Sequence, residues 1–196
     1  GGDNALTINT DHSVGADHIP NEQLLELRSG ALDMMITPTA TGGGDLHSEL
    51  LFQEALYLVA PPENPLSGLS NLSRADLLGS EVLSIDTRYP FHEQTRDICD
   101  ELKLELLTTY EGTSLDSLCQ MCASGLGLAI LPELYLRSDV GGKNVVAPLR
   151  IDDWSGTRTV AALWRRSSVY GETYRQIAEV IQREALLLLQ NSPTGG

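Results

Sequence analysis

The stretch that decides the fold spans residues 113–132 and reads TSLDSLCQMCASGLGLAILP. A capping hydroxyl at Thr113 or Ser114, and a helix-ending glycine at Gly125, predict a short helix between them. The apolar run over 128–132 that follows has the length of a buried strand. The stretch therefore predicts a capped helix, a glycine turn and a strand, in that order.

The same order of signals occurs near the beginning of the chain. Residues 21–30 carry a capping asparagine, apolar positions and a final glycine, and residues 32–37 form a short apolar run before Pro38. Further strands are expected over 6–10, 49–60, 81–85, 104–110, 145–149 and 157–164, further helices over 91–102 and 170–190, and one helical turn over 73–79.

Helices and strands thus alternate along most of the chain, which predicts an α/β fold with largely parallel sheets covered by helices. Because two passages share one pattern, we expect two related, Rossmann-like lobes. The chain is expected to cross between them near 37–44 and to return near 131–139. Lobe I then comprises residues 1–38 and 140–196, and lobe II comprises residues 39–139.

Composition limits the classes of function. The 196 residues carry a formal net charge of -14 with only 13 Lys and Arg, which argues against binding of nucleic acid by this chain itself. No run approaches the ~20 apolar residues that span a bilayer, and no signal peptide opens the chain, so we expect a cytoplasmic protein without membrane contact. The 3 cysteines do not form a disulfide framework.

Three stretches carry a family resemblance in their order and spacing: LLELRSGALD over 24–33, LFQEALYLVAPPENPL over 51–66, and the stretch over 113–132. Together they resemble the effector-binding, or regulatory, domain of LysR-type transcription regulators, over about residues 23–184. The resemblance implies two lobes of the periplasmic-binding-protein type 2 kind joined by crossover strands. It also implies a small-molecule effector in the cleft, a homodimer or homotetramer, and no cofactor.

In this family a winged helix-turn-helix segment precedes the domain and binds DNA. The given sequence contains no counterpart of that segment, so DNA binding is expected only through a missing N-terminal domain. The first strand and first helix of the sensing domain also lack a counterpart. A small ligand, anionic or aromatic, is expected to bind between the lobes and to control the missing domain.

Within the family, residues 82–113 are most similar to the OxyR branch of peroxide sensors. That similarity implies a reactive cysteine after a histidine, with a second cysteine about one helix downstream. Here Pro90 falls at the reactive position and Tyr89 at the histidine, while Cys99 aligns with the downstream cysteine. Because proline has no thiol, a bound effector is favoured over the disulfide switch of that branch.

The expected ligand contacts come first from the helix starts. The hydroxyls of Thr113 and Ser114, with the free N–H groups of that turn, suit a carboxylate or another anion. Ordinary capping would use the same residues. Asn21, which opens the corresponding helix of the other lobe, has the same two interpretations.

Two further turns complete the expected site. Arg88, Tyr89 and Phe91 combine a cation with aromatic rings, which suits a small organic anion with an apolar body, although a solvent-exposed loop can have this composition. Thr37 and Pro38 follow a strand, where they line the opposite wall of the cleft or form a hinge.

Two alternatives remain open. A thiol-based redox sensor would use Cys99, or the pair Cys119 and Cys122, although the spacing of the pair places it on a helical packing stripe. A periplasmic-type solute-binding protein has the same kind of fold. No nucleophile elbow, phosphate loop or zinc motif indicates an enzyme or a metal site, and the histidines in polar loops are expected to be solvated: His12, His18 and His47.

Overall fold

The computed structural model describes residues 8–10, 21–38, 43–87, 89, 91–138 and 145–190. Its elements are, in chain order, β1 (Ile8–Thr10), α1 (Asn21–Ser29), β2 (Met34–Thr37), β3 (Leu46–Ala60), η1 (Pro65–Gly68), η2 (Arg74–Leu77), β4 (Glu81–Ile85), α2 (Phe91–Leu102), β5 (Glu105–Gly112), α3 (Leu115–Ala123), β6 (Ala129–Pro132), α4 (Glu133–Arg137), β7 (Ala147–Pro148), β8 (Gly156–Arg165) and α5 (Gly171–Gln190). His12 and His18 lie outside the described residues.

The larger sheet has the strand order β1-β2-β8-β3-β6, with β7 paired to the end of β3. The expectation of largely parallel sheets is wrong for this sheet, because among the described strands only β1 and β2 run parallel in it. The reason is the pair β3 and β8, two long strands that run in opposite directions, from Leu46 opposite Arg165 to Leu56 opposite Gly156. A register shift between Leu50 and Phe52 interrupts this pairing.

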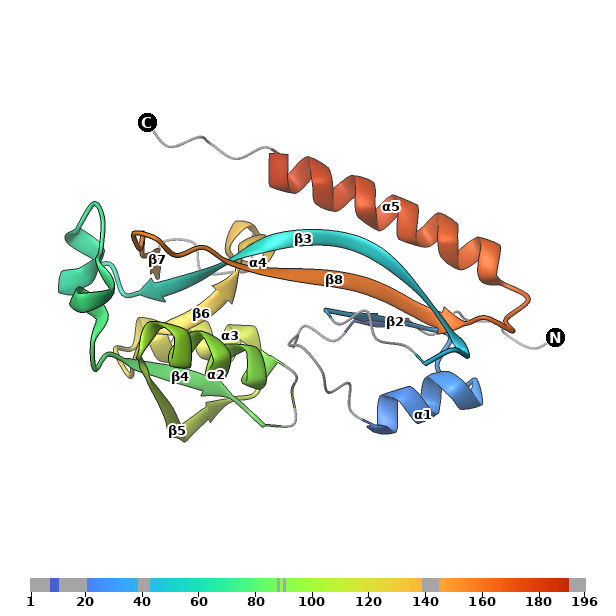
Figure 1. Cartoon of the computed structure of the whole chain (residues 1–196), viewed down its shortest axis with the longest axis horizontal. Helices are drawn as coiled ribbons and strands as arrows, with labels where there is room; N and C mark the ends of the chain where they lie inside the picture. Colours follow the sequence, from blue (N-terminus) through green and yellow to red (C-terminus); the bar gives the residue numbers. More distant parts are fainter. Residues whose placement is uncertain are drawn as a thin grey trace.

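The elements form two α/β lobes joined by β3 and β8, as predicted from the sequence (Figure 1). In one lobe, α5 lies along the β3–β8 ribbon, and α1 lies on the other side of the sheet. In the other lobe, α2 and α3 pack against the parallel pair β4–β5. Leu51 belongs to the core under α5, whereas Leu56, five positions later on β3, belongs to the core of the α2 and α3 lobe.

The helix boundaries follow from local chemistry. Gly30 and Gly125, which were expected to end helices, adopt φ angles of 89° and 78°, in the left-handed region that costs glycine little. The short helix α4 was not predicted, because its five residues follow Pro132 without a capping side chain and are too few to show a helical period.

Helix α4 is held to its surroundings by charged side chains. The Oε2 atom of Glu133 accepts a hydrogen bond from the backbone N–H of Ala55 at 3.3 Å, and Arg137 pairs with Glu133. The Nη1 atom of Arg137 also donates to the backbone carbonyl of Leu188, near the end of α5, at 2.6 Å. This helix therefore connects the crossover strand β3 with the C-terminal turn of α5.

Arg165 fastens α1 to the sheet. Its Nη1 atom donates to the backbone carbonyl of Leu27, in the last turn of α1, and to that of Leu32, which lies just after the helix. We expect Arg165→Met to lower the free energy of unfolding by about 2 kcal/mol, because two part-buried carbonyls lose their donor. Urea unfolding measures the change. The neighbouring Arg166 is exposed, so Arg166→Met should change stability little, and equal losses in the two variants would contradict this role of Arg165.

Candidate functional site

A pocket of about 480 Å³ lies where the two crossover strands meet the start of α3 and the helix α4. Strands β3 and β8 contribute one charged side chain each, and the other lining residues belong to α3, to α4 and to their capping residues. The lining residues are Glu54, Ser114, Leu115, Asp116, Leu134, Tyr135, Ser138 and Arg158. A volume of this size suits a small organic molecule.

A buried ion pair forms one wall of the pocket. Glu54 and Arg158 are direct partners across β3 and β8, and the Nε atom of Arg158 donates to Glu54 Oε1 at 2.6 Å. The side chain of Glu54 is 0% exposed and that of Arg158 is 9% exposed. The other carboxylate oxygen of Glu54 accepts from the backbone N–H of Leu134, at the start of α4, at 2.8 Å. The pair therefore joins both crossover strands to α4.

The guanidinium of Arg158 is not fully satisfied. Its Nη1 atom is enclosed and has no hydrogen-bond partner among the described residues. Burial lowers the pKa of Arg158, although the charge of Glu54 opposes this effect. The guanidinium carbon lies 5.8 Å from the centroid of the Phe91 ring, within the range of a cation–π contact. An enclosed donor without an acceptor costs about 1–3 kcal/mol, so an acceptor placed beside Nη1 would stabilise Arg158.

The start of α3 is capped by its own serines. The hydroxyl of Ser114 accepts from the N–H of Ser117 at 3.1 Å. In return, Ser117 Oγ accepts from the N–H groups of Ser114 and Thr113, at 3.0 Å and 2.8 Å. Three N–H groups that the sequence offered to an anion are thus used within the protein.

Asp116 and Tyr135 join α3 to α4 at the rim of the pocket. The phenol O–H of Tyr135 donates to Asp116 Oδ1 at 2.6 Å. Burial, followed by this hydrogen bond, raises the pKa of Tyr135, so the phenol stays neutral and keeps its proton for Asp116. The Asp116 side chain is exposed and brings a negative charge to the entrance.

Four of the contact residues predicted from the sequence lie at the pocket or near it. Ser114 lines the pocket, and Thr113 is the adjacent exposed residue. Phe91 is fully buried and reaches the site only through Arg158, while Tyr89 is half-buried against the core of the same lobe.

The remaining predicted residues lie elsewhere in the chain. Thr37 is buried at the end of β2, paired with Ala161 of β8, and the half-buried Pro38 follows it; the lining given by the described residues includes neither. Asn21 opens α1 as expected. Arg88 and Pro90 lie outside the described residues.

Sequence reasoning missed the roles of Glu54, Arg158 and Tyr135. A signal for Glu54 was present, since a carboxylate that shares one face of a strand with Phe52 and Leu56 requires a buried partner. The partner is 104 positions away, and only the register of β3 and β8 identifies it as Arg158. Tyr135 could not be found because its helix was not predicted.

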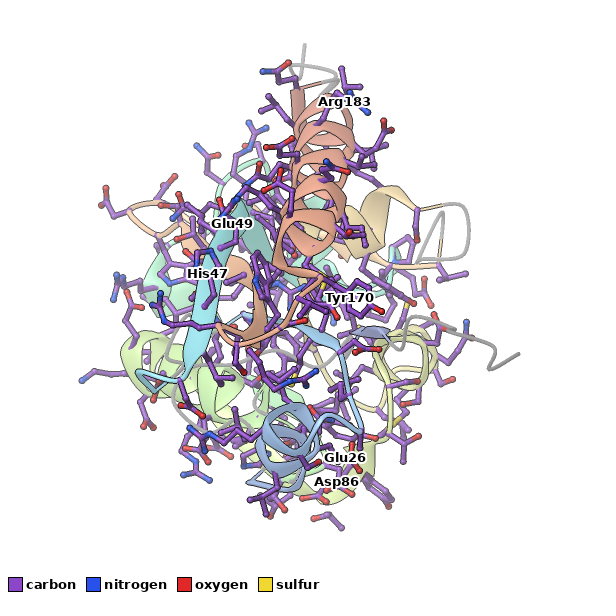
Figure 2. All side chains as sticks on the ribbon, turned by 90° about the vertical axis from the view of Figure 1, so that its right-hand side faces the viewer. Glu26, His47, Glu49, Asp86, Tyr170 and Arg183 are labelled. Atoms are coloured by element: carbon purple, nitrogen blue, oxygen red, sulfur yellow. The ribbon has the colours of Figure 1, made fainter. Side chains whose placement is uncertain are left out.

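His47 was expected to be solvated, but the structure places it on β3 and half-buries it. Figure 2 shows His47 and Glu49 close together on this strand, and the Nε2 atom of His47 lies 3.0 Å from Glu49 Oε2. The imidazole ring also lies 4.5 Å from the ring of Trp164. No group of three or more His, Cys, Asp or Glu residues able to hold a metal occurs in the described parts of the chain.

All three cysteines are buried thiols that form no disulfide: Cys99, Cys119 and Cys122. Burial, with a smaller contribution from Asp100, raises the pKa of Cys99 to about 12. Burial also raises the pKa of Cys122 to about 12, and its thiol donates to the carbonyl of Val59 at 3.5 Å. Thiols in such surroundings lack the thiolate character of a redox sensor.

We expect the native thiols to resist alkylation by iodoacetamide at pH 8. With a pKa of about 12 for Cys99 and Cys122, only roughly one thiol in ten thousand is a thiolate at that pH. Mass spectrometry should find the native chain unlabelled and the urea-unfolded chain labelled three times. Because burial raises the folded-state pKa of Cys99 and Cys122 from 9.0 to about 12, these two thiols stabilise the fold below pH 9 and lose that contribution as the pH rises toward 12. Rapid labelling of native Cys99 would contradict its enclosure.

Known bacterial regulators are similar to this chain. It is 31% identical over 167 residues to the probable hydrogen peroxide-inducible genes activator of Mycobacterium leprae (strain TN), covering 81% of this chain and 51% of that protein. It is 27% identical over 162 residues to the DNA-binding transcriptional dual regulator OxyR of Escherichia coli (strain K12), covering 83% of this chain and 53% of that protein. The chain thus spans about half the length of the curated relatives it matches.

The fold gives the same result as the sequence comparison. The crystal structure of the reduced form of OxyR matches with a TM-score of 0.67 and 25% identity, covering 85% of this chain and 77% of that one. The model of the LysR substrate binding domain matches residues 14–186, which include both lobes and the pocket. The chain belongs to the LysR substrate binding domain family.

Proposed function

We propose that this chain is the effector-sensing and dimerisation domain of a LysR-type transcription regulator, and that it binds a small molecule in the pocket of about 480 Å³. The observation that carries the proposal is the Glu54–Arg158 pair, since it lies on the two strands that join the lobes and leaves one guanidinium donor without a partner among the described residues. A ligand there contacts both crossover strands, α3 and α4, and favours one angle between the lobes.

The other parts of the proposal concern partners. The chain works as a homodimer or homotetramer in the cytoplasm, and a winged helix-turn-helix segment of the whole regulator contacts the DNA. The net charge of -14 supports this division, because phosphate binding needs clustered cations. No described helix is both long and apolar enough to cross a membrane. The chain performs no catalysis, and the lobe limits 1–38 with 140–196, and 39–139, remain predictions.

A thermal-shift screen with small metabolites tests the proposal. A ligand that binds the native state should raise the melting temperature saturably. The double variant Arg158→Met/Glu54→Gln, which removes both buried charges, should lose the shift while it remains folded. A shift that persists in this variant would place the ligand elsewhere, and the absence of any hit would count against effector binding.

A peroxide-responsive thiol switch is the second candidate, favoured by the names of the relatives and by the alignment of Cys99. The burial of the three thiols supports the bound effector instead. Mild peroxide should leave all three thiols free in mass spectrometry. An intramolecular disulfide formed by the native chain would favour the redox function.

A further inference from the structure

The charges around the pocket limit the class of ligand that it can bind. This inference rests on the proposed function. Among the described residues, the single cation of the lining is Arg158, and Glu54 already neutralises it at 2.6 Å. The remaining charge of the lining is the carboxylate of Asp116, which is exposed at the entrance. An anionic ligand would therefore add a second negative charge beside Glu54 and would meet Asp116 on entry.

The start of α3 offers no compensating anion site. The N–H groups of Thr113, Ser114 and Ser117 already donate to serine hydroxyls of the same turn. Asp116 in the first turn also balances the positive end of the helix dipole. An anion would have to displace these internal hydrogen bonds.

Arg158 and an apolar wall line the pocket. The guanidinium of Arg158 keeps one N–H group without an acceptor among the described residues. Leu115, which is 6% exposed, and the half-buried Leu134 and Tyr135 supply apolar surface from two helices. An uncharged acceptor satisfies the donor and keeps the ion pair neutral.

We infer that the pocket binds an uncharged small molecule, whose acceptor oxygen takes a hydrogen bond from Arg158 and whose apolar body lies against Leu115 and Leu134. Of the two chemistries expected from the sequence, anionic or aromatic, the pocket selects the aromatic or otherwise apolar one. The ligand class is thus a carbonyl or hydroxyl compound without a carboxylate.

Benzamide and benzoate test the inference, because they match in shape and differ in charge. Saturation-transfer NMR on the 196-residue chain at millimolar ligand gives both dissociation constants. We expect benzamide to bind about five-fold more tightly, the change that one unit charge causes at 4 Å in a water-like medium. Asp116→Asn should tighten benzoate binding by a similar factor and leave benzamide binding unchanged.

Two variants separate the possible outcomes. Arg158→Met/Glu54→Gln should lose benzamide binding while folded, and Asp97→Asn, an exposed change on α2 outside the lining, should keep it. Tighter binding of benzoate than of benzamide overturns the inference and leaves the proposed function intact. Benzamide binding that survives the double variant overturns the role of Arg158. No binding of either probe also overturns the inference, whereas the proposed function is tested by the metabolite screen.

Discussion

Arg158→Met lowers the free energy of unfolding by about 3–5 kcal/mol, the usual cost of removing one partner of a buried ion pair. The cost arises at Glu54, whose carboxylate is 0% exposed and would lose its cation. Glu54 would keep its hydrogen bond from the N–H of Leu134, but one amide cannot replace a guanidinium. Urea unfolding followed by circular dichroism measures the loss.

The double variant Arg158→Met/Glu54→Gln should recover most of this stability. Glutamine keeps an acceptor for Leu134, and the neutral pair no longer pays for burying two charges. The two substitutions should therefore be strongly non-additive: a double-mutant cycle should find the double variant more stable than Arg158→Met alone. Additive losses would show that the two side chains do not act as a pair.

An exposed ion pair provides the matched control. Arg175 pairs with Glu172 at 2.7 Å on α5, at side-chain exposures of 47% and 70%. Arg175→Met makes the same change of residue, but water replaces the lost partner. Its effect should stay below about 1 kcal/mol. An effect as large as that of Arg158→Met would mean that burial does not decide the cost.

The sequence predicted the elements better than their pairing. Helix α2 and strand β4 occur at the expected residues, because a helical period and a short apolar run are local signals. The antiparallel crossover of β3 and β8 was missed, since strand direction depends on partners about one hundred residues apart. The site divides in the same way: Ser114 was found from its local cap, whereas Glu54 and Arg158 meet only through the register.

Substitution of Phe91, the aromatic neighbour of Arg158, is expected to have the second large effect on the free energy of unfolding. Phe91 is 0% exposed at the start of α2, and its ring belongs to the core of the α2 and α3 lobe. Phe91→Ala should lower the free energy of unfolding by about 3–5 kcal/mol, because it removes the buried ring and leaves a cavity. Phe91→Leu should cost less than about 1.5 kcal/mol, since leucine refills much of the space. Urea unfolding distinguishes the two variants.

Phe52 is the other phenylalanine of the chain and gives the matched control. Its half-buried side chain packs at the edge of the core under α5, so Phe52→Ala should cost clearly less than Phe91→Ala. The ring of Phe91 also faces the Arg158 guanidinium at 5.8 Å, which leucine cannot do. Phe91→Leu should therefore weaken ligand binding in the pocket although the fold is retained. Unchanged ligand affinity in a folded Phe91→Leu variant would show that the ring supports the core alone.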